Sequence, residues 1–339
     1  MGGRAGERAG AASGDPDQRW MAAALALAGR TRGRTAPNPN VGCVIVKGGR
    51  VVGRGWTQPG GRPHAEAMAL AEAGEAARGA TAYVTLEPCA HRSPRGPACA
   101  DLLAEAGVAR VVAALGDPDP RTNGAGLARL AAAGIAVSTG PFADEARRSM
   151  AGFLTRRALG RPQVTLKLAT SLDGCIALAN GESRWITGAE SRAHAHLERA
   201  RHEAILVGRG TWEADAPRLD VRLPGLETRA PQRVILSARG VEAPGCTIIA
   251  DPADIAALPG DHLLIEGGAG AASAFLAADL VDRLLIYRAP ILIGGGRAAL
   301  GDIGLASLAD AHGRWRLTDA RALGSDRLEA YERQRQQDF

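Results

Sequence analysis

The sequence lacks a long apolar run, an apolar leader segment and any cluster of basic residues. No uninterrupted hydrophobic stretch reaches membrane-spanning length, so we expect no membrane segment. The N-terminus has no apolar signal core, which predicts a cytoplasmic protein. The formal net charge is +5, but the arginines are spread along the whole chain. This pattern is weak evidence for nucleic-acid binding and is equally consistent with small phosphorylated ligands.

The length of 339 residues allows two domains of ordinary size, each with its own core. A content of 46% hydrophobic and 23% charged residues is ordinary globular composition. Residues 1–14 are Gly, Ala, Arg and Ser without periodicity, which predicts a disordered tail. A helix expected over 142–159 is broken by Gly160-Arg161-Pro162. We therefore predict a first domain over 15–160 and a second over 161–339.

The first half predicts an α/β/α layered domain. Asp15 can cap a helix that has Pro16 at its first position and runs through Arg30. The apolar run 41–46, a Gly-containing turn and the segment 51–53 predict a hairpin. Strands and helices then alternate, and this order is typical of a sheet covered by helices on both faces.

A metal-binding pattern lies within this predicted domain. His64 and Glu66 stand in Pro-His-Ala-Glu at a helix start, Cys89 follows Leu-Glu-Pro, and Cys99 comes after a loop. One nitrogen and two sulfur ligands leave the fourth tetrahedral position of Zn²⁺ open for water, whose pKa falls to about 7. Glu66 can then carry the water's proton to a ring nitrogen and a departing amine. The pattern predicts a zinc deaminase, with Cys43 and the remaining two cysteines, Cys175 and Cys246, reduced and buried.

Two other interpretations of this pattern remain open. A structural zinc protein would close the metal with a fourth ligand, for which His91 is the candidate; otherwise His91 is a loop residue. A nucleoside or tRNA base deaminase would have a Cys-x-x-Cys spacing, whereas nine residues separate Cys89 from Cys99. Such an enzyme would also need a cationic surface near the zinc pocket.

The motifs of the first half resemble the deaminase half of the bifunctional riboflavin-biosynthesis deaminase/reductases. They are Pro37 to Gly42, His64-Ala65-Glu66 and Thr85 to His91. The resemblance implies a cytidine-deaminase-like zinc domain. Its loop over 93–98 has one residue more than is usual in that family, so either Arg92 or Arg95 takes the place of the family's basic substrate contact. Asn38 either serves turn chemistry or binds substrate.

The second half contains two strand-turn-helix patterns rich in glycine, at 204–211 and 263–270. Small residues in such turns let a phosphate approach the backbone amides at a helix N-terminus. Neither turn completes the Rossmann fingerprint, and by itself each is more often structural than nucleotide-binding. The physical pattern therefore indicates an α/β domain and only suggests a nucleotide.

Segments from Lys167 to Gly294 are similar to the reductase half of the same family, whose fold is dihydrofolate-reductase-like α/β and which uses NADPH. The resemblance implies NADPH contacts at Ala169, Trp185, Thr211, Asp215, Gly268, Ala269, Gly270, Ala271, Ala272, Ser273 and Ala274. It implies substrate contacts at Ser183, Arg199, Leu219, Arg222 and Glu266. Trp185 is equally interpretable as a core residue. Ala216 stands where the family usually has a second Asp.

Together these features predict a two-step enzyme of riboflavin biosynthesis. The first domain would hydrolytically deaminate a phosphoribosylated diaminopyrimidinone with Zn²⁺ and Glu66. The second would use NADPH to reduce the ribosyl group to a ribityl chain, with its side chains positioning the reactants rather than bonding to them. We expect small-molecule substrates, no nucleic-acid or membrane partner, and, from the resemblance, a homo-oligomer.

Overall fold

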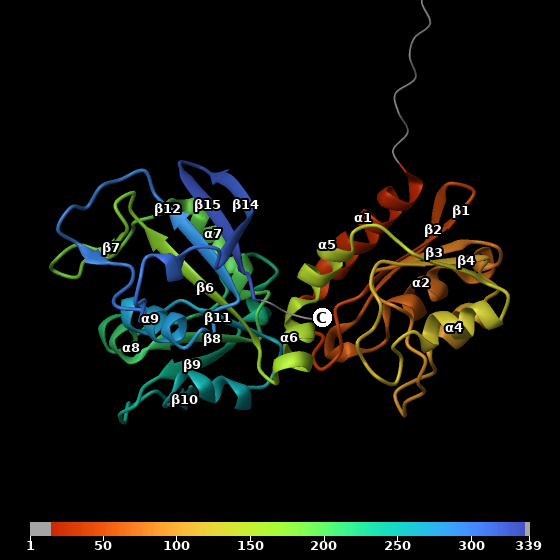
Figure 1. Ribbon diagram of the computed structural model, residues 1–339, viewed down its shortest axis with the longest axis horizontal. Coiled ribbons are helices and arrows are strands. Elements are labelled where there is room, and N and C mark those ends of the chain that lie inside the picture. Colours follow the sequence, from red (N-terminus) through yellow and green to blue (C-terminus); the bar gives the residue numbers. More distant parts are fainter. Residues whose placement is uncertain (1–14, 336–339) are drawn as a thin grey trace, which may run out of the picture. The chain divides into compact units, whose positions relative to one another are not determined.

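A computed structural model describes residues 15–335, and the tail predicted over 1–14 lies outside this range. The described chain forms two compact units, the first comprising 15–35 and 39–150, the second 36–38 and 151–335. Figure 1 draws the first largely in red to yellow and the second largely in yellow-green to blue. The prediction of a single helix over 142–159 is wrong. Helix α5 (Ala143–Ser149) and helix α6 (Ala151–Leu159) are separated at Met150, whose φ of −103° and ψ of 15° are not helical.

The first unit contains a five-stranded sheet in the order β2-β1-β3-β4-β5. β1 pairs antiparallel with β2, which confirms the predicted hairpin, and antiparallel with β3, whereas β3, β4 and β5 are parallel. The strands are β1 (Gly42–Lys47), β2 (Arg50–Trp56), β3 (Thr81–Val84), β4 (Arg110–Ala113) and β5 (Ala136–Thr139).

Helices cover both faces of this sheet, as predicted. They are α1 (Pro16–Ala28), α2 (Ala65–Ala73), α3 (Cys99–Glu105), α4 (Ala125–Ala132) and α5. The carboxylate of Asp15 accepts the Asp17 N–H at 3.0 Å and caps α1. Two glycines let α1 and α2 approach the sheet: a Cβ at Gly42 would lie 1.9 Å from a carbonyl oxygen of α1, and one at Gly55 2.0 Å from a carbonyl oxygen of α2.

The second unit is built on an eight-stranded sheet in the order β10-β9-β8-β11-β6-β12-β15-β14. The strands from β10 to β12 in this order are parallel, and β15 and β14 are antiparallel additions at one edge. Their bounds are β6 (Gln163–Thr170), β8 (Ala204–Gly208), β9 (Gln232–Leu236), β10 (Thr247–Ile249), β11 (His262–Ile265), β12 (Arg283–Arg288), β14 (Trp315–Leu323) and β15 (Asp326–Arg333). A separate ribbon pairs β7 (Cys175–Ala177) with β13 (Arg297–Ala298).

The helices of the second unit are α6, α7 (Ala189–Arg199), α8 (Arg209–Asp215) and α9 (Ala269–Ala277). Phe275 of α9 packs with Leu166 and Leu206 on one face of the sheet. On the other face, Ala195 of α7 packs with Tyr287. This unit is therefore also α/β with helices on both faces. Short 3₁₀ segments cover Gly29–Thr31, Pro59–Gly61, Gly74–Ala77, Glu227–Arg229, Pro252–Ala257 and Ala309–Ala311.

The described cysteines are all free. Cys43 and Cys175 are buried, as predicted, but Cys246 is partly exposed, so its predicted burial is wrong. Burial raises the pKa of the Cys43 thiol well above its usual value, and the nearby Glu66 adds to the shift.

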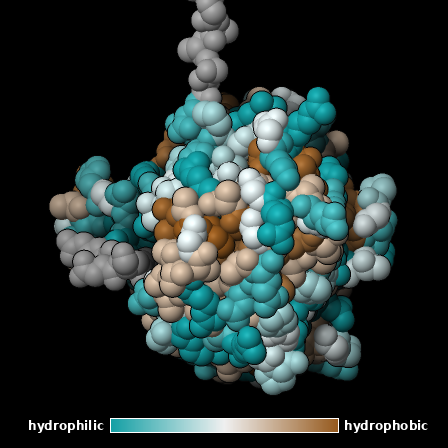
Figure 2. Space-filling model, turned by 90° about the vertical axis from the view of Figure 1, so that its right-hand side faces the viewer, coloured by the Kyte–Doolittle hydropathy of each residue, from teal (hydrophilic) through white to brown (hydrophobic). Residues whose placement is uncertain are grey.

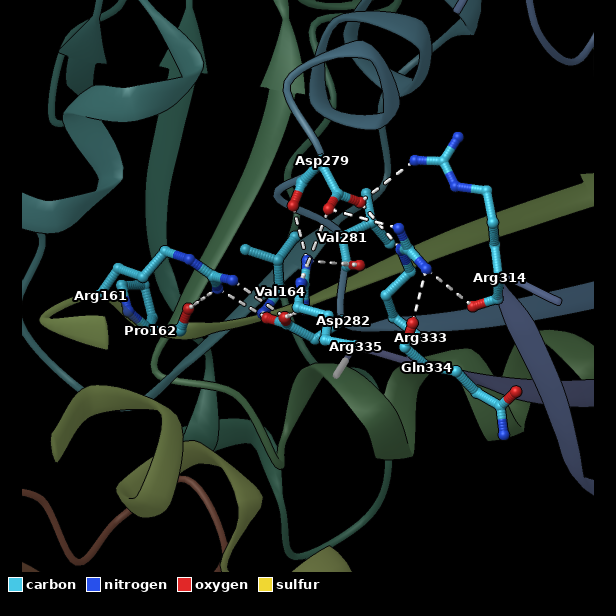
Figure 3. A network of polar contacts seen from close by, with 10 residues as sticks. All are labelled: Arg161, Pro162, Val164, Asp279, Val281, Asp282, Arg314, Arg333, Gln334 and Arg335. Atoms are coloured by element: carbon cyan, nitrogen blue, oxygen red, sulfur yellow. Dashed lines mark hydrogen bonds and ion pairs between the residues drawn. The ribbon is translucent and has the colours of Figure 1, made fainter. Parts of the chain in front are cut away.

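Polar contacts join distant parts of the second unit around Asp279 and Asp282, which precede β12 (Figure 3). Arg161 and Arg335 both pair with Asp282, while Arg333 pairs with Asp279. The visible face in Figure 2 mixes hydrophilic and hydrophobic residues. Among residues 15–335, no helix is both long enough and apolar enough to cross a membrane.

Candidate functional site

The structure brings the three predicted zinc ligands together in the first unit. His64 is the N-cap of α2 and Cys99 is the first residue of α3, while Cys89 lies in the loop after β3. His64 Nδ1 is 3.3 Å from Cys99 Sγ and 3.6 Å from Cys89 Sγ. A tetrahedral zinc ion requires its nitrogen and sulfur ligands to be about 3.6 Å apart, given the usual metal–ligand distances. The donor set and its spacing therefore fit Zn²⁺.

The thiols and the carboxyl group around this site have shifted pKa values. Hydrogen bonds from Cys99 and His64 lower the pKa of Cys89 despite its burial, which favours the thiolate that binds metals. Glu66 lies in the first turn of α2 with 3% of its surface exposed. Its burial raises the pKa, and the neighbouring Cys89 adds to the shift, against the opposing effect of His64. A buried carboxyl group with a raised pKa is suited to accept and return a proton.

His91 does not join the three ligands. Within residues 15–335, the only group of His, Cys, Asp and Glu side chains with metal-binding spacing is His64, Cys89 and Cys99. His91 Nδ1 instead lies 3.3 Å from the hydroxyl oxygen of Thr122. His91 therefore does not supply the fourth ligand that a closed structural zinc site would need.

A cavity of about 430 Å³ adjoins the metal site. His64 and Cys99 lie in its wall together with Arg62 and Arg95. Arg92 is not among the residues that line the cavity, and its Nε lies 3.5 Å from a carboxylate oxygen of Asp101 on α3. The sequence did not decide whether Arg92 or Arg95 is the basic substrate contact, and Arg95 is the one that lines the cavity. Asn38 lies in the short segment 36–38, which groups with the second unit.

Glu87 is a structural residue of this site that the sequence did not single out. Its two carboxylate oxygens accept backbone N–H groups from Asp117 at 3.2 Å, Gly124 at 2.9 Å, Gly126 at 2.9 Å and Leu127 at 3.2 Å. These bonds tie the metal-binding loop after β3 to the start of α4. The residue stands in the Leu-Glu-Pro-Cys motif, but its partners are 30 to 40 positions away, so no local pattern reveals the role.

In the second unit, two of the predicted substrate residues form an ion pair. The Arg199 guanidinium donates to both carboxylate oxygens of Glu266, at 2.7 and 2.9 Å. Lys167 Nζ, which the sequence did not assign to the site, lies 3.9 Å from the same carboxylate. Burial alone would raise the pKa of Glu266, but the hydrogen bonds from Arg199 and the charge of Lys167 outweigh it and lower the pKa to about 2.

Of the other predicted substrate residues, Arg222 is linked to this pair through Asp220. Arg199 also donates to the carbonyl oxygen of Asp220 at 2.9 Å. Arg222 Nε lies 3.4 Å from the Asp220 carboxylate, and both residues line a cavity of about 490 Å³. Leu219 is buried with a positive φ of 54°, and its side chain packs into the core beneath. Ser183 is half-buried in the loop before α7.

Two predicted NADPH contacts from different segments meet. The Gly268 N–H donates to the hydroxyl oxygen of Thr211 at 3.0 Å, so the turn after β11 and the helix after β8 are joined. Gly268, Ala269 and Gly270 remain at least partly exposed, while Ala271, Ala272 and Ser273 are buried and Ala274 is half-buried. A ligand at this turn can therefore reach its first three residues more readily than the side chains that follow.

Trp185 is not a core residue, because 65% of its surface is exposed. The guanidinium of Arg192 lies 4.7 Å from the centre of its ring. Asp215, at the end of α8, lies 3.4 Å from the guanidinium of Arg184. Ala169 lies on β6 opposite Tyr287 of β12. The core interpretation of Trp185 is therefore wrong, and an exposed ring remains available to a ligand.

Comparisons with known proteins match both halves of the chain. Residues 15–115 match the cytidine and deoxycytidylate deaminase zinc-binding region, and residues 162–328 match the RibD C-terminal domain. The riboflavin biosynthesis protein RibD of Escherichia coli is 41% identical over 91% of this chain and 97% of that protein. RibD of Aquifex aeolicus is 39% identical over 87% of this chain and 92% of its own length.

Solved structures agree over nearly the whole chain. RibD of Acinetobacter baumannii, form 1, has a TM-score of 0.84 at 38% identity and covers 94% of this chain and 99% of its own. A diaminohydroxyphosphoribosylaminopyrimidine deaminase/5-amino-6-(5-phosphoribosylamino)uracil reductase from Thermotoga maritima has a TM-score of 0.84 at 32% identity, with the same two coverages. These matches confirm the predicted pair of folds.

Proposed function

This chain belongs to the RibD family of riboflavin biosynthesis proteins, and from that membership we propose how its residues share two consecutive reactions. The protein is a bifunctional deaminase and reductase, with zinc and NADPH as cofactors. The first reaction releases ammonia from 2,5-diamino-6-(5-phosphoribosylamino)pyrimidin-4-one and yields 5-amino-6-(5-phosphoribosylamino)uracil. The second reduces the ribosyl group of that product to a ribityl chain.

The first unit carries out the deamination. When bound by His64, Cys89 and Cys99, zinc would supply an activated water molecule. Glu66 accepts a proton from the attacking water and passes it to the ring nitrogen. It then takes the proton of the hydroxyl group added to the ring carbon and delivers it to the amine, which leaves as ammonia while the carbonyl forms. Its place in the first turn of α2 next to His64 fits this shuttle, and its burial favours the protonated state between the two transfers. Asn38 is a further proposed substrate contact.

The second unit carries out the reduction. NADPH would supply a hydride to C1′ of the sugar. The proposed cofactor contacts are Ala169, Trp185, Thr211, Asp215 and the turn and helix start from Gly268 to Ala274. The proposed substrate contacts are Ser183, Arg199, Leu219, Arg222 and Glu266. The Arg199–Glu266 pair supports this assignment, since it fixes charged hydrogen-bonding groups beside Lys167 in a nearly buried position.

The zinc site carries most weight in this proposal, because three ligands leave a coordination position for water and Glu66 stands beside it. A coupled assay of ammonia release and NADPH oxidation tests it. Glu66→Gln should abolish ammonia release and leave the reduction of pre-deaminated substrate unchanged. Glu72→Gln is the matched control, since Glu72 lies on the same helix but forms an exposed pair with Arg54. Loss of both activities in Glu66→Gln would contradict the division between the units.

We further propose that the enzyme is a cytoplasmic homo-oligomer that acts on small molecules and not on nucleic acid. The spread of arginine along the chain supports the choice of ligand class. Light scattering of the purified protein would measure its mass in solution, and a monomeric mass at all concentrations would exclude the oligomer.

A further inference from the structure

Two loops of the first unit, around residues 60–62 and 95–97, are joined by hydrogen bonds beside the proposed metal site. Arg95 donates to the carbonyl oxygen of Gly60 at 2.6 Å, and Arg62 Nη1 lies 3.5 Å from the carbonyl oxygen of Pro97. The first loop leads into His64 and the second leads into Cys99. Each loop therefore delivers one metal ligand and one arginine to the wall of the same cavity.

The backbone of the second loop is shaped to accommodate Arg62. Gly96 has a φ of 147°, and a Cβ built there would lie 2.9 Å from Arg62 Nη1. A side chain at this position would therefore both strain the backbone and displace the guanidinium. The guanidinium keeps its place because residue 96 is glycine.

The charge of these two arginines is not balanced locally. Within the described part of the chain, neither Arg62 nor Arg95 has a carboxylate within 4.0 Å. Arg92 in the same loop differs, because Asp101 lies 3.5 Å from it and also binds Arg129 at 2.9 Å. A guanidinium has five N–H donors, so a single carbonyl partner leaves most of them available. Two such groups on one cavity wall favour a dianion there.

We propose that Arg62 binds the phosphate group of the deaminase substrate beside Arg95, the loop arginine for which the resemblance already implies a substrate contact, and that Arg62 makes this unit select phosphorylated over unphosphorylated substrates. The cavity wall holds both guanidinium groups and two metal ligands, so a ligand whose ring is at the metal extends its sugar phosphate along that wall. This inference rests on the proposed deamination.

The test measures ammonia release by the full-length zinc-loaded enzyme with the phosphoribosyl substrate and with its dephosphorylated riboside. Arg62→Gln should raise KM for the phosphorylated substrate about 10- to 100-fold, the range expected for one lost charge-assisted hydrogen bond. KM for the riboside should stay within about twofold, because the riboside has no phosphate to lose. Inorganic phosphate should inhibit the wild-type enzyme competitively and Arg62→Gln more weakly.

Two variants separate this role from a general loss of structure. Arg92→Gln changes the same loop at a guanidinium that does not line the cavity and that pairs with Asp101, and it should leave KM unchanged. Gly96→Ala keeps both charges but displaces Arg62, so it should raise KM for the phosphorylated substrate alone. Zinc content, measured by metal analysis, should match wild type in every variant.

Equal effects of Arg62→Gln on both substrates, or no effect on either, would overturn the inference while leaving the deamination intact. Failure of the wild-type enzyme to release ammonia from the phosphoribosyl substrate would instead remove the proposed function itself.

Discussion

Asp282 joins two segments of the second unit that lie far apart in the sequence, and replacing its carboxylate by an amide tests how much the stability of the unit depends on it. The carboxylate accepts from Arg161 at 2.7 and 3.0 Å, near the start of β6, and from the Val164 N–H at 2.8 Å. It also accepts from Arg335, which follows β15 (Figure 3). Two segments of the unit that lie far apart in the sequence thus share a single acceptor group.

The expected cost of Asp282→Asn follows from burial. The side chains of Arg161 and Asp282 are only 9% and 10% exposed, so an amide would leave a nearly buried guanidinium without its counter-charge. Removing one partner of a buried ion pair typically costs about 3–5 kcal/mol. In a domain of this size, each kcal/mol lowers Tm by roughly 2–4 °C. The melting temperature of the second unit should therefore fall by roughly 6–20 °C.

Differential scanning calorimetry of the full chain would measure this change. Asp279→Asn is the matched control in the same turn, since 46% of the Asp279 side chain is exposed although it pairs with Arg333 at 2.8 Å. Its cost should be about 1 kcal/mol or less. Zinc content should be unchanged in both variants, because the proposed metal ligands belong to the first unit. A Tm for Asp282→Asn within about 2 °C of that of Asp279→Asn would refute the argument from burial.

Three further outcomes are expected. The pKa of Glu266 is about 2 in the folded unit, against an ordinary value of 4.5. Ionisation of Glu266 therefore adds about 3 kcal/mol to the free energy of unfolding. This contribution is fully present above pH 4.5 and is lost as the pH falls towards 2. In Glu266→Gln, the urea midpoint of unfolding should fall less steeply with decreasing pH than in the wild type. An unchanged pH dependence would contradict this role of Glu266. A zinc chelator should stop ammonia release but not the reduction of pre-deaminated substrate, and added zinc should restore ammonia release. Loss of both activities would contradict separate sites. Thr211→Val leaves the Gly268 N–H without its acceptor and should weaken NADPH binding roughly tenfold, as measured by calorimetry. Thr211→Ser should bind NADPH about as tightly as the wild type. Equal NADPH affinities of Thr211→Val and the wild type would exclude this contact from the cofactor site.

The sequence predicted elements whose signals are local. Asp15 before Pro16 predicted a capped helix, and α1 begins there. The turn after Val46 predicted a hairpin, and β1 pairs with β2. The proposed zinc ligands stand out in the sequence for a different reason: nitrogen and sulfur donors beside a carboxyl group are a restrictive chemical combination wherever the fold places them.

What the sequence could not predict depends on contacts between distant segments. Met150 continues an apparently helical pattern, yet it is fully buried where one helix ends and the next begins. Glu87 looks like a charged loop residue, but its partners are backbone N–H groups of a loop and helix far along the chain. Lys167 belongs to a strand, and only the pairing of β6 with β11 places it near Glu266.

The irregular loop between Cys89 and Cys99 was the least predictable part of the site, and the structure explains why its length matters little to the proposed metal site. Cys89 is held from its own side, because Glu87 binds the start of α4. Cys99 is held by α3, which it begins, and its N–H donates to Cys89 Sγ at 3.3 Å. Both ends are thus fixed independently of the residues between them. An inserted residue changes which side chains the loop turns towards the cavity, so variation in this loop should alter the choice of substrate before it alters the binding of zinc.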